Sequence, residues 1–103
     1  MYKINKEIIS KFVKNFEFEA STLYSRETQI DEHIHDSVSM IEDFINGNIS
    51  ASTLFEYAYF VLYECLGSKK YSENIKLLDN MNDNEQYEYT IDLLQKYKFI
   101  YIN

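Results

Sequence analysis

Apolar residues recur every three or four positions along most of the 103-residue chain. This is the period of an amphipathic α-helix that buries one face. The first segment shows it clearly, because Ile4, Ile8, Phe12 and Phe16 are spaced four apart. The pattern predicts an all-α fold, a small antiparallel bundle of four to five helices in one domain over residues 1–103. The helices are expected at about residues 3–20, 29–46, 51–66, 72–81 and 84–98.

The stretch FINGNISAS, residues 44–52, stops one helical pattern and starts another. The chain has no proline and only two glycines, Gly47 and Gly67, so the connections are expected to be short. Gly47 suits the position after a helix where the backbone turns left-handed. Ser50, Ser52 or Thr53 can cap the helix that follows. The stretch is therefore predicted to be a helix stop, a tight turn and a helix start.

Three other stretches interrupt the helical pattern. Residues 21–28, STLYSRET, predict a loop in which Thr28 caps the next helix, with Asp31 as its capping-box partner. Residues 82–85, NDNE, predict a turn and a cap. The last residues, KFIYIN at 98–103, are β-prone and predict either a frayed tail or a short packed strand.

Charge is distributed unevenly over the chain, whose net charge is −7. Residues 15–68 hold ten acids and one cation, Arg26, whereas residues 1–14 are net basic. An acidic middle segment repels the phosphate backbone, so nucleic acid is not expected as a ligand. It fits a basic protein partner, because complementary fields speed encounter. Solubility alone is the alternative explanation.

The predicted helix 51–66 carries polar and aromatic residues on nearly every side. At 100° per residue, its outer side and flanks hold a set of acids and aromatic rings: Glu56, Tyr57, Tyr59, Phe60, Tyr63 and Glu64. Glutamates are costly to bury unpaired, whereas tyrosines are enriched where interfaces concentrate binding energy. These six residues are therefore candidates for partner binding. The alternative is that this helix is the central one of the bundle.

The predicted helix 29–46 adds an acidic face. Glu32, Asp36 and Asp43 fall on one side, and Glu42 lies nearby. Like charges four apart cost about 0.2–0.5 kcal/mol, and carboxylates near a helix C-terminus oppose its dipole. This local cost makes the four acids candidates for partner binding, although a solvated face would carry the same residues.

No catalytic, cofactor or metal site is predicted. His33 and His35 are two apart on a helix, so their side chains point in nearly opposite directions and cannot share an ion. Cys65 falls on an apolar face, where a thiol stays neutral and inert. There is no glycine-rich phosphate loop, and an acidic chain supplies carboxylate pairs without any catalytic meaning. The protein is therefore expected not to be an enzyme.

The compartment is predicted from the same residues. The N-terminal stretch lacks the apolar run of a signal peptide, and the longest apolar run, residues 58–63, is too short for a membrane span. The single Cys65 cannot form an internal disulfide, as is usual in a reducing compartment. A cytoplasmic protein without membrane association is expected.

Residues 44–64 resemble a segment of colicin D immunity-type proteins, in which a helix ends in a similar glycine turn before an aromatic helix. The matching positions cover about a fifth of the chain: Phe44, Gly47, Ile49, Ser50, Ala51, Phe55 and Tyr59. The arginine-containing tail of that family has no counterpart here, and no contact residue is carried over. The resemblance implies a bacterial immunity protein that binds the nuclease domain, often a ribonuclease, of a bacteriocin or contact-dependent inhibition toxin.

Two alternatives remain at the level of the sequence. The chain is also compatible with a phage-type inhibitor of a host nucleic-acid-binding complex. It is compatible as well with a self-associating helical regulator in which the aromatic helix is buried in a homodimer.

Overall fold

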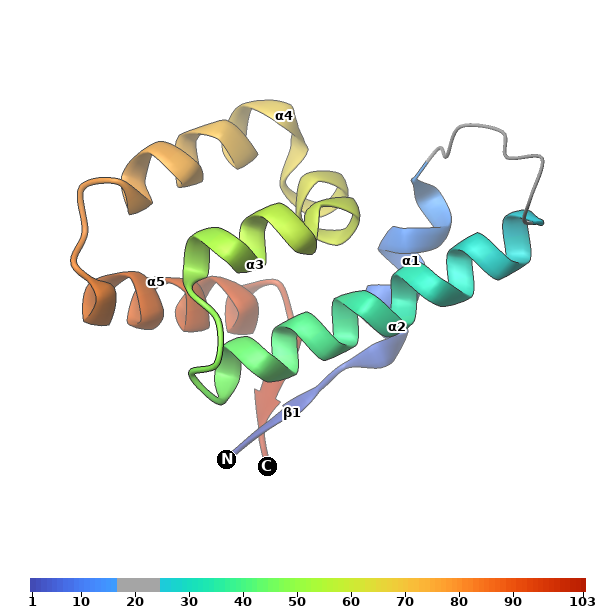
Figure 1. The fold of residues 1–103 in the computed structure, drawn as a ribbon, viewed down its shortest axis with the longest axis horizontal. Coiled ribbons are helices and arrows are strands. Elements are labelled where there is room, and N and C mark those ends of the chain that lie inside the picture. The colour runs from blue at the N-terminus through green and yellow to red at the C-terminus, as the bar shows by residue number, and fades with distance from the viewer. Residues whose placement is uncertain (17–24) are drawn as a thin grey trace.

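The computed structural model describes residues 1–16 and 25–103. Helices dominate this part of the chain, so the predicted all-α class is confirmed (Figure 1). In chain order the elements are β1 (Tyr2–Ile4), α1 (Lys6–Asn15), α2 (Arg26–Ile45), α3 (Ala51–Tyr57), α4 (Tyr59–Leu78), α5 (Asp83–Lys96) and β2 (Ile100–Ile102).

Short polar side chains begin several of these helices. The side chain of Asn5 accepts from the backbone N–H of Ile8 at the start of α1, and Ser50 caps α3 in the same way. Asn82 caps α5, as the NDNE stretch predicts, and it also forms a full capping box with Glu85. These local bonds fix where the helices begin.

The start of α2 differs from the prediction. Ser25 caps this helix through the backbone N–H of Thr28, so residues 26–28 are helical rather than part of a loop. Thr28 is therefore not the cap, because the earlier serine offers the same oxygen acceptor. The remainder of that predicted loop, residues 21–24, and the predicted helical residues 17–20 lie outside the described residues.

Gly47 ends α2 in the way the sequence predicts. Its φ is 77°, its N–H donates to the Phe44 carbonyl at 3.0 Å, and the Asn48 N–H donates to the Asp43 carbonyl at 2.8 Å. This pair of bonds is the Schellman motif, in which a left-handed residue after the helix satisfies two of its last carbonyls. The turn directs the chain from α2 back along α3.

The prediction of one continuous helix over residues 51–66 is wrong. The helix breaks at Ala58, which ends α3 and precedes α4, and α4 itself is kinked at Gly67. Gly67 has φ 82° and ψ 162°, a backbone conformation that only glycine adopts readily. The chain therefore turns twice, and the second half of α4 folds back above α3 and α5 (Figure 1).

The two ends of the chain form an antiparallel two-stranded sheet. Lys3 pairs with Tyr101, and the Asn5 N–H donates to the Phe99 carbonyl at 2.8 Å. The predicted first helix therefore starts at Lys6 rather than at residue 3, and Ile4 belongs to β1. Of the two predictions for residues 98–103, the packed strand is confirmed.

The core joins residues from every helix of the described chain. Ile9 and Val13 of α1, Ile41 of α2, Leu54 of α3 and Leu94 of α5 are fully buried. Polar groups tie the second half of α4 to α5: buried Asn74 accepts from the Tyr89 hydroxyl and donates to the Lys70 carbonyl. Because α4 is held on both sides of its kink, α3 and the second half of α4 have defined relative positions.

Candidate protein-binding surface

The four predicted acids of α2 lie along its outward side. Glu32, Asp36 and Glu42 are exposed, and Asp43 is half-buried. The opposite side buries Ile41 and the ring of Phe44 in the core. At 1.5 Å per residue, the row from Glu32 to Asp43 is about 16 Å long. Helical periodicity therefore placed three of these four acids on the exposed side of the helix.

The exposed acids of α2 form no ion pair with a cation of the described residues. Within residues 1–16 and 25–103, one ion pair is present, between Lys69 Nζ and Glu73 Oε1 of α4 at 4.0 Å. Glu32, Asp36 and Glu42 have no such partner there. Ion pairs within the described part of the fold therefore do not account for these acids, and a surface pair would in any case contribute little to stability. Their negative field is directed outward.

The acids and aromatic residues of helix 51–66 do not form the single stripe that the sequence predicts. The break at Ala58 leaves Glu56 and Tyr57 on α3, and places Tyr59, Phe60, Tyr63 and Glu64 on the first half of α4. Both glutamates are exposed, and Tyr57 is 60% exposed. The other three rings are half-buried, so they contribute to the core as well as to the surface.

Tyrosine rings pack against one another where α4 folds back. Tyr59 and Tyr63 stack with ring centroids 4.8 Å apart, and Tyr71 meets both edge-on at 5.4 and 5.6 Å. The Tyr71 hydroxyl donates to the backbone carbonyl of Phe55 at 2.7 Å. Burial raises the pKa of the Tyr71 phenol, and the charges of Tyr59 and Glu56 raise it further.

Tyr71 was missed by the sequence analysis, which begins a separate helix at residue 72. Its position next to Tyr59 depends on the kink at Gly67, which no periodicity reveals. The only available signal was the glycine itself, and a glycine is equally compatible with the helix end that was predicted there.

Phe60 contacts α1 and α2 as well as the neighbouring ring of Tyr59. Its ring lies 4.6 Å from that of Phe16 and 4.1 Å from the imidazole of His33. His33 is half-buried in this contact, whereas His35 is exposed on another side of α2. Phe60 therefore helps to hold α4 against the first two helices.

A groove of about 310 Å³ separates α3 from the second half of α4. We call it the α3–α4 groove; it is lined by Ser52, Phe55, Glu56, Tyr59, Tyr71, Ile75 and Leu78. Phe55 and Leu78 are 1% exposed and form its floor, whereas Ile75 is 37% exposed. The groove brings two of the predicted residues, Glu56 and Tyr59, to one site together with residues of α4 that the sequence analysis left out.

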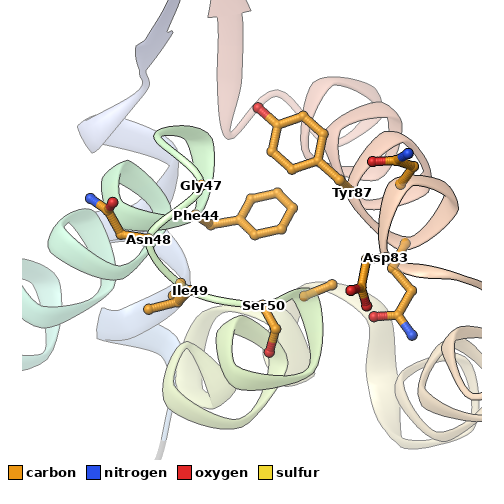
Figure 2. A pocket seen from close by; sticks show the side chains of 10 residues that line it. Phe44, Gly47, Asn48, Ile49, Ser50, Asp83 and Tyr87 are labelled. Carbon is orange, nitrogen blue, oxygen red and sulfur yellow. The ribbon is translucent and has the colours of Figure 1, made fainter.

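A second pocket, of about 410 Å³, lies beside the turn between α2 and α3 (Figure 2). Phe44 and Tyr87 point toward each other across it, with ring centroids 5.1 Å apart, and the Tyr87 hydroxyl donates to the Ile45 carbonyl at 2.8 Å. Gly47 and Asn48 form its rim on the α2 side, opposite Asp83 of α5. These contacts anchor the turn between α2 and α3 to α5, so the turn has a structural role.

Cys65 is the cysteine of the chain, and its side chain is half-buried on α4. Burial raises the pKa of the Cys65 thiol to about 11, so the thiol is protonated at neutral pH. In the described part of the chain, no three His, Cys, Asp or Glu side chains come together so that they could hold a metal ion. None of the helices described is long and apolar enough to cross a membrane.

Comparisons of the chain with protein-family models, with curated proteins and with solved structures find no match.

Proposed function

We propose that the chain is a bacterial immunity protein that binds and neutralises a cognate nuclease toxin domain, most simply a ribonuclease. The observation that carries the proposal is the row of outward-facing acids on α2, which have no cationic partner among the described residues. Glu56, Tyr57 and Glu64 are also exposed, on α3 and α4, and add two further carboxylates to the surface of the chain. The resemblance of residues 44–64 to immunity proteins supports the same class.

The physical basis is charge complementarity. A nuclease that binds a polyanion presents a basic cleft, and a row of carboxylates about 16 Å long can lie against such a cleft in place of phosphates. The long-range field raises the association rate, and the aromatic rings supply contact area at low entropic cost. This action requires no chemistry by the chain itself, so the proposal does not make it an enzyme.

The test is inhibition of a purified toxin nuclease domain encoded beside the gene for this chain. The variant carries Glu32→Lys and Asp36→Lys on α2, and the matched control carries Glu88→Lys and Asp92→Lys on α5. All four side chains are exposed, and both variants change the net charge equally. We expect the α2 variant to associate about tenfold more slowly or worse, and the control to stay within about threefold of the unmodified chain.

Equal losses in both variants would show that only net charge matters, which contradicts an α2 interface. Continued RNA cleavage at saturating concentrations of the unmodified chain would refute the immunity role. Inhibition of a host nucleic-acid-binding complex instead would assign the acidic surface to the phage-type alternative.

Self-association is a second candidate because β2 exposes apolar side chains. Tyr101 is 49% exposed and Ile102 is 68% exposed, and a two-stranded sheet leaves strand edges that a second copy can pair with. Sedimentation velocity over a concentration series discriminates the two roles. A stable dimer that persists with the toxin domain present would favour self-association.

A further inference from the structure

We infer that the α3–α4 groove is an anchor site for a basic protein partner, which inserts one apolar side chain between the helices and pairs a neighbouring lysine or arginine with Glu56. The inference rests on the proposed function only for the identity of that partner. It adds a site formed largely by residues outside the acidic row, chiefly Phe55, Tyr71, Ile75 and Leu78.

The shape and lining of the groove fit a side chain. Its volume, about 310 Å³, is at the lower limit of pockets that bind small molecules, which span about 300–1,000 Å³. Its floor consists of buried aromatic and aliphatic groups, and Ile75 stands on the rim, 37% exposed. Covering Ile75 and the half-buried Tyr59 would remove their apolar surface from water, which is the main driving force for association.

The groove is already formed without a ligand. The hydrogen bond of 2.7 Å from the Tyr71 hydroxyl to the Phe55 carbonyl joins its two walls directly. The ring of Tyr71 also lies 5.9 Å from that of Phe55 and 5.4 Å from that of Tyr59. A preformed pocket avoids much of the ordering cost of binding, as is usual for the pockets that take up interface hot spots.

Charge decides which occupant suits the groove. Glu56 is the one charged residue of the lining, and its side chain is exposed at the edge. The groove is therefore bordered by one negative charge. An apolar group flanked by a cation is therefore favoured, and one flanked by a carboxylate is repelled.

The same reasoning disfavours a second copy of this chain as the occupant. The chain has a net charge of −7, and its exposed acids extend over α2, α3 and α4. Two copies brought together at Glu56 would place like charges at the interface, which opposes association. A basic partner gains from the same charges.

The experiment uses the full chain, labelled with ¹⁵N, and amidated helical peptides as probes. The first peptide carries one phenylalanine flanked by lysines. The comparison peptides replace the phenylalanine by alanine, or the lysines by glutamates. We expect the first peptide to shift the amide resonances of α3 and of residues 68–78, and to bind at least about tenfold more tightly than either comparison peptide.

Two matched pairs of variants locate the site. Ile75→Glu places a charge on the rim of the groove, whereas Leu77→Glu changes another exposed apolar residue of α4 that does not line it. Glu56→Lys reverses the charge of the lining, whereas Glu88→Lys does so at an exposed position of α5 outside it. We expect losses of about tenfold for the first member of each pair and less than about twofold for the second.

The inference is overturned if resonance shifts occur elsewhere, or if the glutamate-flanked peptide binds as well as the lysine-flanked one. It is also overturned if the chain forms a dimer that Ile75→Glu disrupts, because a second copy would then occupy the groove. Peptide binding at the groove without inhibition of any nuclease would refute the immunity role alone. Inhibition of the toxin that survives both Ile75→Glu and Glu56→Lys would refute the anchor site alone.

Discussion

Replacing Gly67 by alanine tests the kink on which the α3–α4 groove depends. Gly67 has φ 82° and ψ 162°, and a side chain built on it meets no atom within 4 Å. Steric contact with neighbours therefore plays no part, and the whole effect comes from the backbone conformation. An L-residue held in such a region costs about 1–3 kcal/mol.

The net change is smaller because alanine also restricts the unfolded chain. This restriction returns about 0.4–1 kcal/mol to the folded state, so we expect a loss of about 1–2 kcal/mol. For a domain of this size, the loss corresponds to a decrease in Tm of roughly 4–16 °C. If the chain escapes the strain by straightening α4, Tyr71 must leave the Phe55 carbonyl, and the groove is lost.

Asparagine at the two glycines provides the control. Gly47, with φ 77° in the Schellman motif, is a left-handed position that asparagine tolerates. Gly67→Asn should therefore cost as much as Gly67→Ala, whereas Gly47→Asn should cost less than about 1 kcal/mol. Urea unfolding followed by circular dichroism gives these values from the midpoint, provided that the slope stays unchanged.

One result would refute this reasoning. If Gly67→Ala is as stable as the unmodified chain and keeps its helical content, the helix runs straight through residue 67. The second half of α4 would then not fold back over α3, and the α3–α4 groove would not exist.

Three further predictions concern single groups. Tyr71→Phe removes a buried hydrogen bond to Phe55 and should cost about 1–2 kcal/mol in urea unfolding; no change would mean that the bond is absent. Burial raises the pKa of the Cys65 thiol from 9.0 to about 11, so the contribution of the protonated thiol to folding stability is full below pH 9 and is lost as the pH rises through 11. The rate at which iodoacetamide alkylates Cys65 in the folded chain should therefore keep rising up to about pH 11. A plateau of that rate near pH 9 would contradict the shift. Lys98 has φ 64°, a left-handed conformation that costs a non-glycine residue about 1–2 kcal/mol. Lys98→Gly should remove this strain, and the greater freedom of the unfolded chain should offset about 0.5–1 kcal/mol of the gain, so Tm should rise. A lower Tm would contradict this expectation.

Local signals made some elements predictable from sequence. The end of α2 at Gly47 and the capping box of Asn82 and Glu85 each involve residues within a few positions of one another. The acids of α2 were placed on its outer side because helical periodicity alone separates that side from Ile41. Features that depend only on residues a few positions apart, such as caps and helical periodicity, can be predicted from the sequence.

The end of α5 illustrates where local signals fail. The Phe99 N–H donates to the Leu94 carbonyl and the Lys98 N–H donates to the Gln95 carbonyl, so the helix ends in a second Schellman motif. Its left-handed residue is Lys98, where glycine is usual, and the sequence therefore predicts a helix up to residue 98. Packing of Phe99 and Ile100 in the core compensates for the strain, and packing is not visible in the local sequence.

The sequence by itself determined the helical class, the end of α2, the starts of α3 and α5, and the acidic outer side of α2, because each follows from neighbours along the chain. Only the tertiary structure decided the pairing of β1 with β2, the breaks at Ala58 and Gly67, and the meeting of Tyr71 with Phe55 and Tyr59. These features depend on contacts between residues far apart in the chain, whose free energy outweighs the local preference to continue a helix.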